Sequence, residues 1–183
     1  MRMLGSQVSS QLYELAEGQD GYFSTNQAQS RGISRHSLAK AVARGKLLRL
    51  SRGVYRLKHF PEISANAHLW RAVLWPQVRT TISGVLSHYT ALRLHGLSDI
   101  NDERTHVALP PALRTKRTVP DDLVLHFENL QPHEITYADG LPTTSVARTL
   151  QDIAQIGDTL ILRNALRDAR AKKLRVPLEF ERV

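Results

Sequence analysis

The chain has 183 residues, of which 42% are hydrophobic and 23% are charged, a composition typical of a globular protein of one or two domains. No apolar run approaches the roughly eighteen residues of a membrane-spanning helix, so no membrane partner is expected. Cysteine is absent, which excludes disulfides and thiolate metal sites and favours a reducing, cytoplasmic environment.

The net charge of +8 is concentrated in the first third of the sequence. Residues 1–60 contain ten Lys or Arg and three acids, which gives +7, whereas residues 61–183 contain fifteen and fourteen, which gives +1. Between Gly21 and Pro61 there are nine Lys or Arg and no Asp or Glu. Charge of one sign confined to one segment indicates a binding surface for a negatively charged partner.

The pattern of this basic segment predicts a winged helix-turn-helix. Apolar periodicity and capping residues predict three helices, at residues 8–17, 25–31 and 35–44. Ser34 is expected to cap the third helix, and Gly32 is expected to form the preceding turn with a positive φ. Two short strands follow, at residues 48–50 and 54–57, with Arg52 at the tip of their turn.

The third helix and the hairpin predict an interface with double-stranded DNA. Ala39 and Ala43 leave the outer helix face slim enough for a major groove, while Arg35 and Ser37 lie near the helix start, where base edges are usually contacted. Phosphate contacts are expected from Arg44, Lys46, Arg49 and Arg52. The alternative, a solvated basic helix face, is disfavoured by the lack of nearby acids and by the basic hairpin. The full predicted DNA-binding set is Arg31, Ser34, Arg35, His36, Ser37, Lys40, Arg44, Lys46, Arg49, Arg52 and Arg56.

Two domains are expected, a winged-helix domain at residues 1–60 and a larger domain at residues 61–183. Further helices are predicted at residues 66–78, 82–95, 144–154 and 158–173. Strands are predicted at residues 105–109, 123–127 and 134–137, with a short strand or irregular segment at 141–143. The fold class is therefore α+β: an N-terminal winged helix-turn-helix followed by a mixed α/β C-terminal domain, with helices packed around a small sheet.

No catalytic residues, metal site or cofactor are expected. The eight histidines include His88 and His95 on one predicted helix and His106 and His126 on predicted strands, but no cysteine or HExxH spacing accompanies them. The acidic pattern of common metal-dependent nucleases, Gly-rich phosphate loops and GxSxG are also missing, which disfavours an enzyme. The basic loop at residues 114–117, with Arg114, Lys116 and Arg117, has two open interpretations: a solvated loop or an additional DNA contact.

Several motifs occur together in an order typical of one family. The first group is Gly21-Tyr22-Phe23-Ser24-Thr25, Arg31-Gly32-Ile33-Ser34, Arg44-Gly45-Lys46-Leu47 and Arg52-Gly53-Val54-Tyr55-Arg56. The second group is Ser87-His88-Tyr89-Thr90-Ala91-Leu92, His95-Gly96-Leu97, Thr105-His106-Val107-Ala108-Leu109-Pro110 and the segment Leu141 to Leu150 followed by Asp152. Through these motifs the chain resembles the AbiEi-type antitoxins of type IV toxin–antitoxin and abortive-infection systems, over about residues 10 to 170.

The resemblance implies an antitoxin of a bicistronic toxin–antitoxin system. Such proteins bind inverted repeats in their operator through the winged helix, repress their own operon and counteract a nucleotidyltransferase-like toxin. The implied partners are operator DNA and that toxin, and no enzymatic activity is implied. Two alternatives stay open at this stage: a DNA-binding nuclease, and a transcriptional regulator without a toxin partner.

Overall fold

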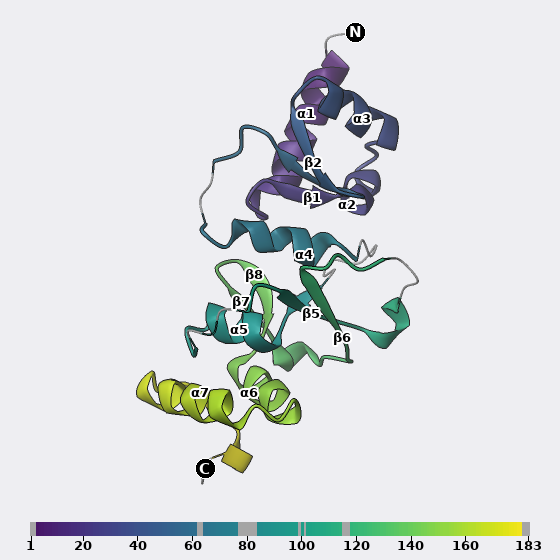
Figure 1. Ribbon diagram of the computed structural model, residues 1–183. Helices are drawn as coiled ribbons and strands as arrows, with labels where there is room; N and C mark the ends of the chain where they lie inside the picture. The colour runs from purple at the N-terminus through teal and green to yellow at the C-terminus, as the bar shows by residue number, and fades with distance from the viewer. Residues whose placement is uncertain are drawn as a thin grey trace. The chain divides into compact units, whose positions relative to one another are not determined.

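A computed structural model describes residues 3–61, 64–76, 84–98, 100, 102–114 and 118–180 (Figure 1). The chain forms two compact units, Met1–Ser83 and Gly84–Val183. The first is a winged helix and the second is a mixed sheet with helices, so the predicted α+β class is confirmed. None of the helices in these ranges combines the length and the hydropathy that crossing a bilayer requires.

The first unit combines short helices with a three-stranded antiparallel sheet. Its helices are α1 (Met3–Glu17), α2 (Thr25–Ser30), α3 (Arg35–Ala43) and α4 (Trp70–Leu74). Its strands lie in the order β1 (Tyr22–Ser24), β3 (Val54–Leu57) and β2 (Leu47–Ser51). The three predicted N-terminal helices and the hairpin are therefore present, and α1 begins at Met3 rather than Val8.

Local side-chain chemistry explains where α2 and α3 begin. Ser24 caps α2 in a capping box with Gln27, whose side chain accepts a bond from the Ser24 backbone N–H at 2.8 Å. Ser34 caps α3, as predicted, by accepting from the Ser37 N–H at 3.1 Å. Gly32 has φ +76°, a conformation that costs glycine little. Gly32 and Ser34 therefore fix the tight turn between α2 and α3 and the direction in which α3 begins.

The core of the first unit lies between the helices and the sheet. Its buried members are Leu12, Ala16, Phe23, Ala28, Ile33, Leu38, Leu47 and Tyr55. Phe23 and Tyr55 come from neighbouring strands and stack at 5.7 Å between ring centroids. Each fully buried Leu or Phe contributes about 1.5–3 kcal/mol by leaving water, so α3 is held on a packed support.

The predicted helix at residues 66–78 is shorter in the structure. A 3-10 turn, Ala67–Leu69, leads into α4, which ends at Leu74, while residues 77 and 78 lie outside the described ranges. Because α4 contacts β1, the compact unit extends past residue 60 to Ser83. The functional division into residues 1–60 and 61–183 stays a prediction.

The second unit is built on a mixed five-stranded sheet. In spatial order its strands are β6 (Leu123–Phe127), β5 (Thr105–Leu109), β4 (Val85–Leu86), β8 (Leu141–Thr144) and β7 (Ile135–Ala138). Its helices are α5 (His88–Leu94), α6 (Val146–Gln155) and α7 (Thr159–Ala171). Helix α5 contacts β5 and α6, and α6 contacts α7, around a core that includes Leu92, Leu150 and Leu166 (Figure 1).

The predicted helix at residues 82–95 is wrong in its first part. Val85 and Leu86 form β4, which pairs with Ala108 and Val107 of β5, and the helix begins only at His88. Both residues are buried between two neighbouring strands, so tertiary pairing overrides the local helical periodicity. Residues 82 and 83 lie outside the described part of the chain.

Candidate nucleic-acid interface

Helix α3 presents a narrow polar stripe. Arg35, His36, Ala39, Lys40 and Ala43 are exposed at spacings of three to four residues, and Leu38 on the opposite side is fully buried. The side chains of Ala39 and Ala43 are single methyl groups, so this face of the helix is narrow, as expected from the sequence. A helix of this profile matches the form that enters a major groove.

The residues at the start of α3 differ in what their side chains can reach. The hydroxyl oxygens of Ser34 and Ser37 lie 3.0 Å apart and hydrogen-bond to each other, and Ser37 is half-buried. Arg35 is exposed beside them. Of the two residues predicted to contact base edges, Arg35 therefore has the more open position.

Cations from α3 and from the residues after it gather around an apolar hollow. The hollow has a volume of about 640 Å³ and lies between α1, α3 and the base of the β2–β3 hairpin. Its lining includes Lys40 of α3, Arg44 at the C-cap of that helix and Lys46 of the following turn, together with apolar residues such as Leu12 and Leu57. Four predicted DNA contacts, Ser37, Lys40, Arg44 and Lys46, therefore line one hollow from a single stretch of ten residues.

The hairpin carries two further exposed cations and one that is buried. Arg49 lies opposite Tyr55 on the sheet, and Arg52 lies in the turn, both exposed. Arg56 is only 8% exposed, its Nη2 donates to the Phe60 carbonyl at 3.1 Å, and its guanidinium lies 5.5 Å from the Tyr22 ring centroid. This burial disagrees with the expected DNA contact of Arg56: the side chain lies on the face of β3 opposite the core residue Tyr55 and is held by the Phe60 carbonyl.

Five exposed cations of the first unit have no acidic partner among the residues that the structure describes. Among described residues, no carboxylate lies within ion-pair distance of Arg35, Lys40, Arg44, Lys46 or Arg49. Arg31 pairs with Glu14 at 3.8 Å, but both side chains are exposed, and such pairs contribute little. The positive charge of this surface is therefore available to an outside partner.

The second basic loop is described only at its edge. The Arg114 guanidinium lies 4.7 Å from the centroid of the Phe127 ring, a cation–π contact with β6. Residues 115–117, which include Lys116 and Arg117, lie outside the described residues. A DNA contact by this loop stays a prediction.

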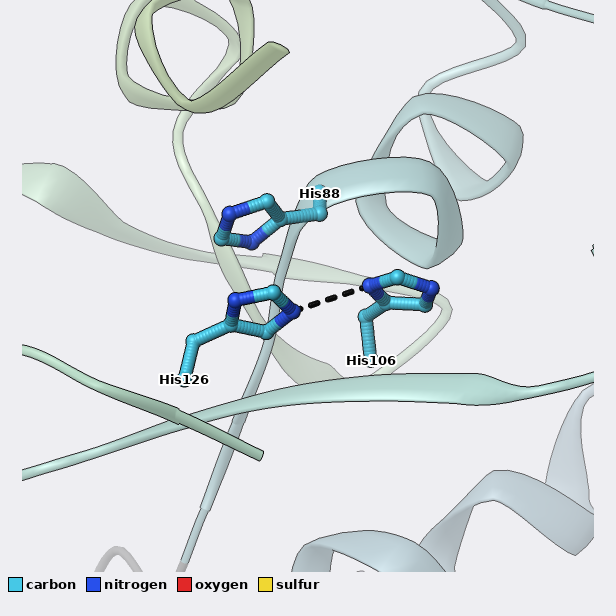
Figure 2. Close-up of side chains that lie close together, drawn as sticks. All are labelled: His88, His106 and His126. Carbon is cyan, nitrogen blue, oxygen red and sulfur yellow. Dashed lines mark hydrogen bonds between the residues drawn. The ribbon is translucent and has the colours of Figure 1, made fainter. Parts of the chain in front are cut away.

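Three histidines that are far apart in sequence converge in the second unit (Figure 2). One ring nitrogen from each of His88, His106 and His126 lies within 4.8 Å of the others. Burial, reinforced by the other imidazoles, lowers the pKa of His88 to about 3 and that of His126 to about 4. Burial also lowers the pKa of His106, against the opposing effect of Asp102. Sequence spacing gave no sign of this cluster, because its members come from one helix and two strands.

A family model matches part of the first unit, and one solved structure is similar to a larger part of the chain. Residues 10–58 match a family model described as "Transcriptional regulator, AbiEi antitoxin". Among solved structures, the chain is similar to the RV2827C protein from Mycobacterium tuberculosis, with 20% identity and a TM-score of 0.46. That similarity covers 81% of this chain and 60% of the other, so the chain spans less than two thirds of that protein. No curated protein matches.

The family match covers the segment that carries α2, α3 and the hairpin, and it ends before the second unit begins. The resemblance of the later motifs, from Ser87 to Asp152, stays a prediction. Over residues 10–58, the resemblance to the AbiEi antitoxin family of transcriptional regulators is confirmed.

Proposed function

We propose that this protein is the antitoxin of a bicistronic toxin–antitoxin system and represses its own operon by binding inverted repeats in operator DNA. The observation that carries the proposal is a set of five exposed cations without an acidic partner among the described residues: Arg35, Lys40, Arg44, Lys46 and Arg49. The family match over residues 10–58 supports a regulatory role.

Two kinds of contact account for binding and for choice of site. Helix α3 enters the major groove with Arg35 at a base edge, where a bidentate contact to guanine distinguishes bases by about 1–3 kcal/mol. Arg44, Lys46, Arg49 and Arg52 contact phosphates, which fixes register without reading sequence. Arg35 therefore governs specificity, whereas the other four govern overall affinity.

Fluorescence anisotropy with labelled duplexes tests this division of roles. The duplexes are the DNA upstream of the gene and a scrambled duplex of the same length. Arg35→Ala is expected to reduce the affinity ratio between the two by about 5- to 150-fold, equivalent to 1–3 kcal/mol. Arg163→Ala, at an exposed position of α7, is the matched control and leaves the ratio unchanged. Equal preference in wild type and Arg35→Ala would reject the assignment of Arg35.

The antitoxin role concerns the second unit, which we assign to countering a nucleotidyltransferase-like toxin in the cytoplasm. The test co-expresses the chain with the product of the adjacent reading frame and measures growth. Rescue by the full chain, but not by a vector carrying only residues 1–83, is the expected result. Absence of a toxic neighbour would leave a plain regulator, and metal-dependent cleavage of plasmid by the pure protein would indicate a nuclease instead.

A further inference from the structure

The histidine cluster is assembled by strand register and by the helix that follows β4. In the parallel pair β5–β6, His106 lies opposite Val124 and His126 lies opposite Ala108. Positions 106 and 108 face the same side of a strand, so His106 and His126 are diagonal neighbours on one face of the sheet. His88 opens α5, which contacts β5 and brings the third ring onto this pair (Figure 2).

A chain of hydrogen bonds fixes the orientation of two of the rings. His106 Nε2 lies 2.9 Å from Asp102 Oδ2, and because the carboxylate only accepts, this nitrogen carries the proton. The lone pair of His106 is therefore on Nδ1, which lies 2.9 Å from His126 Nε2. A histidine whose far nitrogen donates to a carboxylate is the arrangement that orients metal-binding imidazoles.

The third ring is held in an unusual backbone conformation. His88 has φ +50°, which is rare for a residue with a side chain and recurs at functional sites. Its ring stacks on His126 at 3.5 Å between centroids, and its Nδ1 lies 3.0 Å from the Ser87 hydroxyl. The fold thus keeps three imidazoles together, two of them buried and that of His126 half-buried.

A buried carboxylate oxygen lies beside the cluster without a hydrogen-bond partner. Asp152 is 1% exposed, and its Oδ2 has no such partner among the described residues. The other oxygen, Oδ1, accepts from Arg148 Nε, so the carboxylate is held in place. Asp152 Oδ2 lies 3.8 Å from His88 Nδ1. Asp152 already forms an ion pair with Arg148, so its Oδ2 adds an oxygen near the cluster rather than an uncompensated charge.

The geometry points to a divalent transition-metal site, with zinc as the best-fitting ion, formed by His88, His106 Nδ1 and His126 Nε2. Ligand nitrogens on tetrahedral zinc are about 3.3 Å apart, given zinc–nitrogen bonds of about 2.0–2.1 Å. The His106–His126 separation of 2.9 Å therefore opens by only a few tenths of an ångström. His88 rotates out of the stack so that a lone pair faces the ion, and His126 shifts its proton from Nε2 to Nδ1.

Ligand chemistry selects the class of ion. Three neutral imidazoles suit zinc, copper, nickel or iron, whereas magnesium and calcium require oxygen ligands. A fourth position is left for water or for the nearby Asp152 carboxylate. The alternative is a structural cluster of hydrogen-bonded histidines without a metal, which predicts no stoichiometric uptake of any ion.

Calorimetric titration of the chelator-treated full chain with zinc chloride tests the site. One zinc per chain is expected, with a higher thermal midpoint, and cobalt(II) should give the visible absorption of a tetrahedral nitrogen site. His126→Gln keeps a donor toward His106 and is expected to abolish the one-to-one binding. Asp102→Asn is expected to weaken it by about 10- to 100-fold, because Asp102 only orients His106.

His133→Ala removes an exposed histidine of the same unit and serves as the control, with unchanged binding expected. Far-UV circular dichroism and a cooperative thermal transition establish that each variant is folded. The proposal is overturned if the wild type takes up no stoichiometric zinc. It is also overturned if folded His126→Gln binds zinc as tightly as the control.

Discussion

The salt dependence of DNA binding gives a quantitative test of the proposed interface. Four cations are assigned to phosphates, and each contact releases counterions from the duplex. Each phosphate contact contributes a slope of about −0.9, so a plot of log K against log salt concentration should have a slope of about −3.6 for one bound chain. Raising salt from about 50 to about 200 mM, a change of about 0.6 log units, should therefore weaken binding roughly 150-fold.

Removing two of these cations should halve the slope. Lys46→Ala with Arg49→Ala leaves two phosphate contacts, so the slope falls to about −1.8 and the same salt change weakens binding only roughly 12-fold. Both residues are exposed and have no ion pair among the described residues, so their loss should not disturb the fold. The assay is anisotropy on a scrambled duplex at four salt concentrations, with Arg163→Ala as the control. A double variant that keeps the wild-type slope would refute the assignment.

Three further predictions concern stability, each measured by urea unfolding. Arg56→Ala should lower the free energy of unfolding by about 1–3 kcal/mol, because it leaves the Phe60 carbonyl without its donor. The same variant should keep the wild-type salt dependence of DNA binding, and a weaker salt dependence would indicate that Arg56 contacts DNA. Gly32→Ala should cost about 1–2 kcal/mol through backbone strain alone, since an added Cβ meets no atom within 4 Å, and a neutral result would contradict its φ of +76°. Leu150→Ala, at a fully buried site, should cost about 2–5 kcal/mol, and a loss below about 1 kcal/mol would mean that this core is loosely packed.

The first unit was largely predictable because its signals are local. Ser34 caps α3 and Gly32 turns the chain through interactions within a few residues, so the sequence reveals them. The charge pattern is likewise a property of the sequence itself. The burial of Arg56 was missed because it depends on a contact with the Phe60 carbonyl on the face of β3 opposite the core, which the alternation of the strand does not specify.

The second unit was harder to predict because long-range pairing decides its structure. The two-residue strand β4 exists only because β5 and β8 flank it. The histidine cluster depends on the register of β5 against β6 and on the place where α5 begins. A sequence pattern that would have found it is a histidine near the middle of each of two paired strands, but only if their parallel pairing were already known.

Footprinting of the full chain on the DNA upstream of its gene tests the central claim most directly. We expect protection of an inverted repeat, which needs more protein when Lys46 and Arg49 are replaced by alanine and is unchanged in Arg163→Ala. Protection no stronger than on unrelated DNA, or a footprint that the loss of these cations leaves unchanged, would contradict a role for α3 and the hairpin in operator binding.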